Sequence, residues 1–392
     1  MIKSTAVRPV RGLRPFAFQG GLVLWDRASS RLMAFNGATA AIWPQIKAGR
    51  SPRQIASGLA RRYGLPLERA QTDVDTLFAE LLHLGVLVGA DFATHAEDGG
   101  ARPADLSSPP LAQLKLKLAG LRLSIEAEVG VIEFLRPLFY RRISADDKID
   151  HSIRISGPAS NAAISIDGAP HSVSRSHQET VGVIYEFVRE ALYPNTDWLA
   201  LFHAATVARD DTALLLPAPS GSGKSVLLSS LVRDGYDYLS DSYACVSAGD
   251  HRVWPFPLGI NLKLGSRDFV EIPRGFEAVD VVIPQGVEPI EIMNLELRDQ
   301  ILVPPSEAWA RPPAHLSAAV FPRYVARAEP ALARLTAIDA LARLLAAPIY
   351  LGDPLNAQRI SRLLRWVAAT PFYTLVYGNL DAAKMLIARL LP

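Results

Sequence analysis

The first ninety residues carry a hydrophobic pattern typical of a β-hairpin followed by short helices. Two apolar runs in residues 20–35 (GGLVLWDRASSRLMAF) flank the polar segment RASS, which predicts a hairpin that turns at this segment. Apolar residues then recur at helical spacing. These later elements are predicted as helices over residues 38–46, 51–63 and 67–84 and a closing strand over residues 85–88. A hairpin with three helices predicts a small winged-helix module.

A polar segment separates this module from the rest of the chain. Residues 94–110 (THAEDGGARPADLSSPP) combine Gly, Pro, Ser and charged residues with almost no apolar content, which is typical of a linker. We therefore predict an N-terminal domain over residues 1–93, a linker over residues 94–110 and a larger domain over residues 111–392.

The larger domain mixes strand-like and helix-like segments, so its predicted fold class is α/β (α+β) with a mixed sheet. Its first half predicts strands at residues 114–118, 121–127, 153–156, 162–167 and 172–174 and a helix over residues 180–193. Its last part predicts strands over residues 320–324 and 372–377 and helices over residues 331–345, 356–367 and 381–391.

The middle of the larger domain contains a glycine-rich segment between a strand-like run and a helix-like run. Residues 218–225 (APSGSGKS) fit the phosphate-binding pattern Gly-x-x-x-x-Gly-Lys-Ser/Thr, with Ala218 in place of the first glycine. Backbone N–H groups in such a turn surround an anion, and the helix N-terminus adds positive potential. The alternative is a Gly/Ser-rich turn that binds nothing. The strand, the spacing, the lysine and the serine together favour a nucleoside triphosphate site.

Individual residues of this region have expected roles. Lys224 would reach the outer phosphates, and the Ser225 hydroxyl would bind Mg²⁺. Asp241 follows the next strand-like run and is expected to be a second Mg²⁺ ligand, with Asp237 as the less favoured candidate. Lys263 is either a further phosphate ligand or a solvated lysine on a strand. The predicted nucleotide-binding residues are Pro219, Ser220, Gly221, Ser222, Gly223, Lys224, Ser225, Val226 and Lys263.

Composition narrows the classes of function. The 392-residue chain is 49% hydrophobic and 20% charged, and its formal net charge of +2 gives no indication of nucleic-acid or membrane binding. The single cysteine, Cys245, excludes an internal disulfide framework and is expected to be buried rather than nucleophilic. The N-terminus does not have the pattern of a signal peptide, and no run approaches the ~18 apolar residues of a membrane span. A cytoplasmic protein is expected.

The segment over residues 199–246 resembles the HPr kinase/phosphorylase family, which shares its core with phosphoenolpyruvate carboxykinases. His203 lies 15 residues before Ala218, and residues 235–241 match the approach to the family's paired aspartates. The resemblance extends more weakly to residues 257–261 and covers about residues 112–380. It implies a kinase that uses ATP and Mg²⁺. It places Asp241 as the base for an acceptor serine hydroxyl, with His203 and Lys224 as further catalytic residues. His203 could instead be a hydrogen-bonded core residue.

Two departures from the family pattern change what the resemblance implies. Ser242 stands where the family has its second aspartate, and the acidic residue expected before Leu258 is replaced by the segment WPFP. Both argue against phosphorylase activity and against the HPr protein as substrate. They fit a divergent branch of HPr-kinase-like proteins encoded with peptide-natural-product machinery, some of which phosphorylate serine in a precursor peptide. Members of the kinase family are hexamers, which leaves a homo-oligomer open.

The N-terminal module is similar to the PqqD family of peptide-modification chaperones. The similarity rests on the hairpin LVLWDRASSRLMAFNGATAAIW, the helix SPRQIASGLARRYG and the closing LLHLGVLV. It implies capture of a leader peptide as an added strand on the hairpin edge, next to the third helix. A winged-helix domain used for dimerisation or DNA binding is the alternative.

Together these features predict an ATP-dependent kinase for a serine hydroxyl in a ribosomally made precursor peptide, whose leader the N-terminal domain would hold. Two alternatives stay open. One is a kinase for a small molecule or folded protein with a regulatory N-terminal module. The other is a non-catalytic, nucleotide-gated peptide-binding scaffold.

Overall fold

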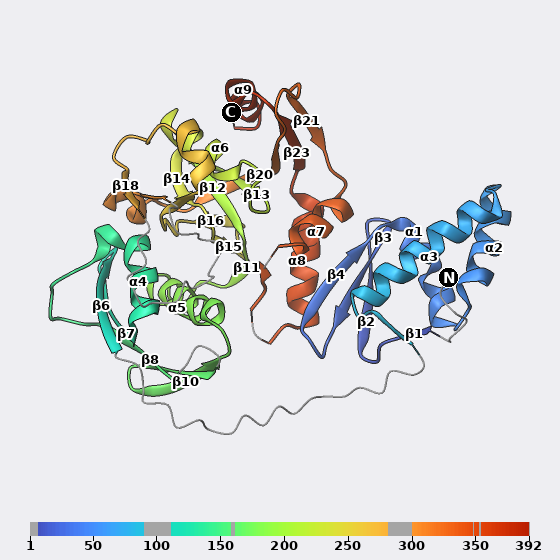
Figure 1. Cartoon of the computed structure of the whole chain (residues 1–392), viewed down its shortest axis with the longest axis horizontal. Coiled ribbons are helices and arrows are strands. Elements are labelled where there is room, and N and C mark those ends of the chain that lie inside the picture. The colour runs from blue at the N-terminus through green and yellow to red at the C-terminus, as the bar shows by residue number, and fades with distance from the viewer. Residues whose placement is uncertain are drawn as a thin grey trace. The chain divides into compact units, whose positions relative to one another are not determined.

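The computed structural model describes residues 7–89, 111–157, 161–280, 300–347, 349–352 and 354–391. Its internal contacts divide the chain into two units. The first unit combines residues 1–104 with residues 336–346, and the second combines residues 105–335 with residues 347–392. Figure 1 shows their elements coloured along the chain. The predicted linker over residues 94–110 lies outside the described residues.

The predicted hairpin is the centre of the N-terminal unit. Strands β3 (Gly21–Asp26) and β4 (Arg31–Phe35) pair antiparallel on either side of the RASS turn, which confirms the hairpin. Strand β2 (Leu13–Phe18) completes the sheet in the order β2-β3-β4 and was not predicted. Pro15 lies inside β2 and argues against a strand in the sequence. Because β2 is an edge strand, one side of its backbone is unpaired and can accommodate the proline.

Helices α1 (Gly37–Lys47), α2 (Pro52–Tyr63) and α3 (Leu67–His83) follow the sheet, as predicted. Their starts are set by local chemistry. The Asn36 side chain accepts a hydrogen bond from the Thr39 N–H at 3.2 Å at the start of α1. Ser51 and Gln54 form a reciprocal capping box at the start of α2. Strand β5 (Leu87–Gly89) closes the unit by pairing with β1 (Val7–Pro9).

A helix from far along the chain completes the N-terminal unit. Helix α7 (Ala337–Leu345) packs against β4, and a Cβ atom at Gly21 would overlap with the Ile338 side chain. Leu22 and Leu24 of β3 belong to the core formed with α1–α3, whereas Gly21, Val23 and Trp25 point to the other face and are also buried. The sheet is therefore covered on both faces.

The predicted helix over residues 331–345 is wrong in its first part. Residues Ala331–Arg334 form strand β21, which pairs antiparallel with β23 (Phe372–Tyr377). The helix starts only after Thr336, whose side chain accepts a hydrogen bond from the Asp339 N–H at 3.2 Å. Apolar residues recur through both the strand and the helix, so their pattern does not show where one ends and the other begins. The Thr336 N-cap marks that boundary.

The C-terminal unit begins with a five-stranded sheet in the order β10-β9-β8-β7-β6. Its strands are β6 (Leu111–Leu118), β7 (Leu121–Glu128), β8 (His151–Ser156), β9 (Ala162–Ile166) and β10 (Ala169–Ser174). Alternate residues of β6 and β7 share one hydrophobic core with α4 (Val129–Leu138) and α5 (His177–Leu192). These two helices therefore cover the same face of the sheet.

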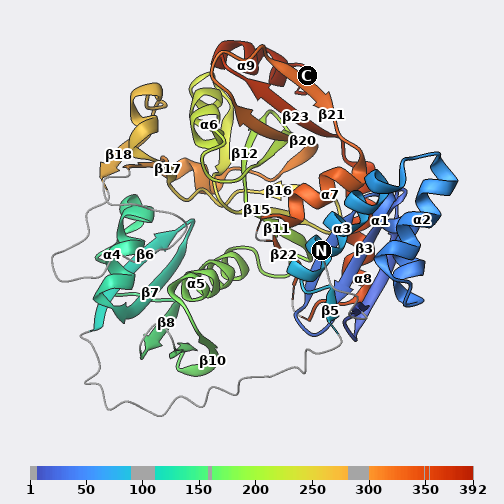
Figure 2. The ribbon, with the colours of Figure 1, turned by 45° about the vertical axis from the view of Figure 1, so that its right-hand side comes forward.

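A ten-stranded mixed sheet forms the rest of this unit, with the path β14-β12-β13-β20-β16-β15-β11-β22 and with β23 paired to β20. Its strands not yet placed are β11 (Trp198–Phe202), β12 (Ala204–Arg209), β13 (Thr212–Pro217), β14 (Asp237–Ser240), β15 (Ala244–Ser247), β16 (Arg252–Trp254), β20 (Ala314–Tyr324) and β22 (Ile349–Tyr350). Helices α6 (Lys224–Arg233) and α9 (Leu380–Ala388) pack on it with a second core, and both views show them side by side (Figures 1 and 2). The described part of this unit also contains α8 (Ala357–Ala369) and a small sheet of β17 (Ile260–Leu262), β18 (Glu277–Asp280) and β19 (Gln300–Val303).

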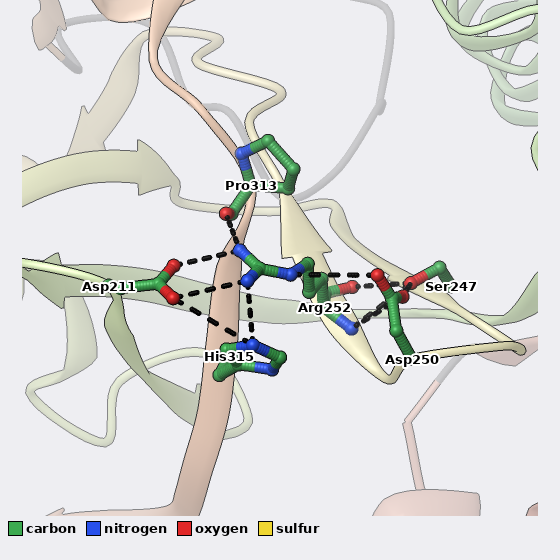
Figure 3. Close-up of polar contacts among 6 residues, drawn as sticks. All are labelled: Asp211, Ser247, Asp250, Arg252, Pro313 and His315. Carbon is green, nitrogen blue, oxygen red and sulfur yellow. Dashed lines mark hydrogen bonds and ion pairs between the residues drawn. The ribbon is translucent and has the colours of Figure 1, made fainter.

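The two ends of β13 carry different chemistry. At its beginning, the Arg252 guanidinium donates to both oxygens of Asp211, at 2.8 and 3.1 Å, and to the Pro313 carbonyl at 2.7 Å. The Nε2 atom of His315 lies 2.6 Å from the same guanidinium (Figure 3). This network joins the beginnings of β13, β16 and β20. The glycine-rich segment follows the other end of β13.

Candidate phosphate-binding site

The glycine-rich segment forms a turn between β13 and α6, as the sequence predicts. Gly223 precedes α6 with φ of 88°, and Gly221 has φ of 79°. Both angles belong to the left-handed region that favours glycine. At Gly223 there is also no space for a side chain, because a Cβ atom would lie 2.5 Å from the Tyr377 hydroxyl and 2.9 Å from the Tyr324 Cβ. A turn of this kind leads the chain into a helix N-terminus, where an anion is stabilised.

Two tyrosines from the C-terminal part of the chain hold this turn in place. The Tyr324 N–H donates to the Ser222 carbonyl at 2.9 Å, and the Tyr377 hydroxyl donates to the Gly223 carbonyl at 3.1 Å. Their rings meet edge to face with centroids 5.7 Å apart, because β20 and β23 are paired in parallel. Burial raises the pKa of Tyr377, so its hydroxyl stays protonated and can donate. No motif in the sequence marks either tyrosine as a site residue.

Lys224, Ser225 and Asp241 meet directly beside the turn. Lys224 Nζ forms an ion pair with Asp241 Oδ1 and also donates to the Asp241 backbone carbonyl at 2.7 Å. The two side chains are 10% and 2% exposed. The Ser225 hydroxyl lies 3.5 Å from Asp241 Oδ2, and the Asn261 N–H donates to the same oxygen at 3.3 Å. The structure thus brings together a buried cation, a hydroxyl and a carboxylate at the N-terminus of α6.

Asp237, the first residue of β14, and Asp241, the residue after its last, lie in different surroundings. Asp241 follows the strand and faces the turn, whereas Asp237 starts the strand and pairs with Arg311 at 2.8 Å. The residue directly after Asp241 is Ser242, so Asp241 has no second carboxylate as its neighbour in the sequence. Asn261 was not predicted as a site residue, since its contact with Asp241 joins residues 20 positions apart.

His203 lies close enough to Lys224 and Asp241 for both charges to influence its pKa. It occupies the break between β11 and β12 and is half-buried. Burial lowers its pKa from the usual 6.5, the Lys224 charge acts in the same direction and Asp241 opposes them. The imidazole is therefore neutral at pH 7. Within the described part of the chain it makes no hydrogen bond to Lys224 or Asp241.

The remaining predicted ligands surround the turn more loosely. Pro219, Ser220 and Gly221 are exposed, and Val226 is half-buried in the first turn of α6. Lys263 is half-buried and directly follows β17, two residues after Asn261.

Several atoms of the turn fit a magnesium–nucleotide group. The Ser222 hydroxyl is buried and makes no hydrogen bond to any described residue, which is costly unless a ligand supplies a partner. Ser225 and Asp241 offer the hard oxygen atoms that Mg²⁺ prefers. Among the described residues, no three His, Cys, Asp or Glu side chains cluster as a ready-made metal cage.

Other predictions concern parts of the chain outside the site. Cys245 is fully buried, as expected, and burial raises its pKa to about 12, which disfavours the nucleophilic thiolate. In the ranges that the structure describes, no helix has both the length and the apolar character needed to cross a membrane.

Comparison with known proteins gives a family for part of the N-terminal unit. The family model for coenzyme PQQ synthesis protein D (PqqD) matches residues 21–87. This segment is PqqD-like. The match runs from the first residue of β3 to the first residue of β5 and confirms the predicted resemblance for this module.

The chain was also compared with curated proteins and with solved structures. No curated protein matches the chain. One solved structure, a lasso peptide synthetase B1 complexed with the leader peptide, is 24% identical and has a TM-score of 0.20. The match covers 21% of this chain and 98% of that chain.

Proposed function

We propose that this chain is an ATP-dependent kinase that transfers the γ-phosphate of ATP to a serine hydroxyl of a ribosomally made precursor peptide. The observation that carries the proposal is the contact of Lys224 and Ser225 with Asp241 at a glycine turn and helix N-terminus. Such a group combines phosphate binding with a carboxylate that can accept a proton. The resemblance to HPr kinases supports the choice of a hydroxyl as acceptor.

The loop residues would bind and orient the triphosphate. The backbone of residues 219–223 and the N-terminus of α6 would surround phosphate oxygens, and the orphan Ser222 hydroxyl would gain a partner. Ser225 and Asp241 would hold Mg²⁺, which neutralises charge on the phosphates when it is bound. Tyr324 and Tyr377 keep the turn in shape from outside.

Lys224 and Asp241 would change partners when the nucleotide binds. In the structure the lysine neutralises the carboxylate. If phosphate oxygens take Lys224, Asp241 Oδ1 loses that cation and can accept the proton of a serine hydroxyl, while Oδ2, which lies beside Ser225, would be the oxygen that serves Mg²⁺. The Asn261 N–H and the Ser225 hydroxyl would keep the carboxylate oriented. The neutral His203 would contribute no positive charge that competes for Asp241.

The N-terminal unit would supply the peptide. Its PqqD-like segment contains the edge strand β4, whose outer backbone groups can pair with an extended leader peptide. A leader held there raises the local concentration of the acceptor serine at the catalytic group without any contact to the serine itself. Even a modest leader affinity would therefore lower the KM of the peptide.

The transfer step is tested with two matched aspartate variants. The full chain, ATP, Mg²⁺ and a precursor peptide encoded beside the gene are incubated, and mass spectrometry detects a phosphate adduct on the peptide. Asp241→Asn should bind nucleotide and lose transfer by at least about 1,000-fold, because the base is gone. Asp237→Asn makes the same change at the other end of β14 and should keep activity. Unchanged transfer by Asp241→Asn would remove this residue from its role.

The leader is tested by comparing the full precursor with its core peptide alone. We expect the leader to lower KM by about 10- to 100-fold with little change in kcat, since tethering acts on encounter rather than on chemistry. Equal KM values would favour a kinase for other acceptors with a regulatory N-terminal unit. No adduct on any peptide, with nucleotide binding intact, would favour the non-catalytic scaffold.

A further inference from the structure

The C-terminal unit contains a basic cavity that shares no residue with the phosphate-binding turn. It has a volume of about 340 Å³ and lies where the β6–β7 hairpin meets two short 3-10 segments, η1 (Tyr140–Arg142) and η4 (Ser306–Ala310). The polar and aromatic side chains that line it are Lys117, Arg141, Arg142, Ser144, Ser306 and Trp309. None of the described residues that line the cavity is a carboxylate. Among these residues, three cations therefore face one space without an acidic group.

The three cations are unequally neutralised. Arg141 is partly neutralised by a carboxylate, because its Nε lies 3.1 Å from Glu277 Oε2. Its Nη1 also donates to the Gly275 carbonyl at 2.6 Å. Arg142 donates to the Ser306 hydroxyl at 2.6 Å, which is a neutral partner. Among the described residues, Lys117 has no ion-pair partner. The cavity thus has an excess of positive charge.

Burial makes this excess unfavourable at Arg142. Loss of solvent lowers the pKa of its guanidinium, and the neighbouring Arg141 acts in the same direction, although Glu307 opposes them. A half-buried cation beside a second cation is stabilised by an anion that replaces the missing solvent. Ser144 and Ser306 add hydroxyl groups that can complete hydrogen bonds to such an anion.

We propose that this cavity binds a phosphate monoester. Cations from two elements and serine hydroxyls from two more positions approach from several directions, which suits the three terminal oxygens of a tetrahedral phosphate better than the two of a carboxylate. Ligand pockets commonly have volumes of about 300–1,000 Å³, so the cavity has space for an organic group beyond the phosphate. The buried Trp309 and the apolar Ile143 form part of the wall for that group.

The test measures binding of O-phosphoserine, inorganic phosphate and glutarate to the full chain by isothermal titration calorimetry. The measurements use a Lys224→Met background, which weakens the phosphate-binding turn and leaves the cavity unchanged. We expect O-phosphoserine to bind at least about tenfold tighter than glutarate. Inorganic phosphate as tight as O-phosphoserine would identify free phosphate as the ligand. Equal binding of glutarate, or no binding of any probe at millimolar concentration, would overturn the proposal.

Variants locate the binding. Lys117→Met and Arg142→Gln should each weaken O-phosphoserine binding about tenfold, since each loses a charge-assisted contact. Lys148→Met removes an exposed lysine outside the cavity lining and should have no effect. Lys117 is exposed, so its replacement should leave the melting temperature unchanged and keep the test valid if Arg142→Gln unfolds the chain. Wild-type affinity in Lys117→Met would contradict the assignment.

Discussion

The two ends of β13 both carry a cation paired with an aspartate, but the two pairs differ in how far water reaches them. At the end that leads into the glycine turn, the side chains of Lys224 and Asp241 are 10% and 2% exposed. At the other end, the Arg252 and Asp211 side chains are 25% and 60% exposed. Arg252 is already surrounded by Asp211, Pro313 and His315, so the protein itself satisfies it (Figure 3).

This difference shows that an ion pair by itself does not indicate a site. The exposed network is screened by water and joins three strands, which is a structural role. The buried pair lies beside a helix N-terminus and a glycine turn whose Ser222 hydroxyl has no hydrogen-bond partner among the described residues. Those neighbours give a ligand something to bind, and burial makes each contact stronger than it would be in water.

The largest expected effect comes from the same substitution at both ends. Lys224→Met should weaken Mg·ATP binding at least about 100-fold, because charge-assisted hydrogen bonds to phosphate are lost. Arg252→Met removes an equally charged side chain from the other end and should change binding by less than about twofold. A fluorescent ATP analogue measures both. Similar losses in the two variants would break the distinction between the ends.

A second pair of variants tests whether the turn needs its exact shape. Gly223→Ala should destabilise the fold by about 2–3 kcal/mol and impair nucleotide binding, because φ of 88° and the nearby Tyr377 and Tyr324 oppose a side chain. Gly221→Ala faces the backbone penalty with open space around its Cβ, and should cost about 1 kcal/mol. Urea unfolding gives both free energies. Equal costs would show that the tyrosines do not constrain the turn.

The Arg252 network should contribute little to stability. Arg252→Met is expected to lower the free energy of unfolding by about 1 kcal/mol, because its partners are exposed and water can replace the guanidinium. Salt should reduce the difference between wild type and variant. Urea unfolding at low and high ionic strength checks this, and a cost above about 3 kcal/mol would show that the network behaves like a buried one.

The smallest expected effect is a pH dependence from the half-buried His203. Its folded pKa lies below the usual 6.5, so the unfolded chain binds more protons between the two values. The free energy of unfolding should therefore fall as pH decreases from about 6.5 and level off below the folded pKa. His203→Gln should lack this component. Denaturant unfolding between pH 5 and 8 on both proteins isolates it, and identical pH profiles would contradict it.

The sequence by itself determined the elements whose signals are local. The hairpin, the capped start of α2 and the strand–turn–helix around residues 218–225 each depend on residues a few positions apart. Strand β2 and strand β21 were missed for the opposite reason. Their pairing with β3 and β23 overrides an unfavourable proline in one case and an ambiguous apolar pattern in the other.

Only the tertiary structure decided what surrounds those local elements. The Tyr377 hydroxyl reaches the turn from 154 residues away, and Asn261 reaches Asp241 from 20 residues away. Helix α7 joins the N-terminal unit although more than 200 residues of the other unit precede it. Such contacts leave no periodic pattern or motif, because they are set by the pairing of strands and the shape of the core rather than by neighbouring residues. The sequence therefore predicted the turn and its local chemistry, and the fold supplied the residues that surround it.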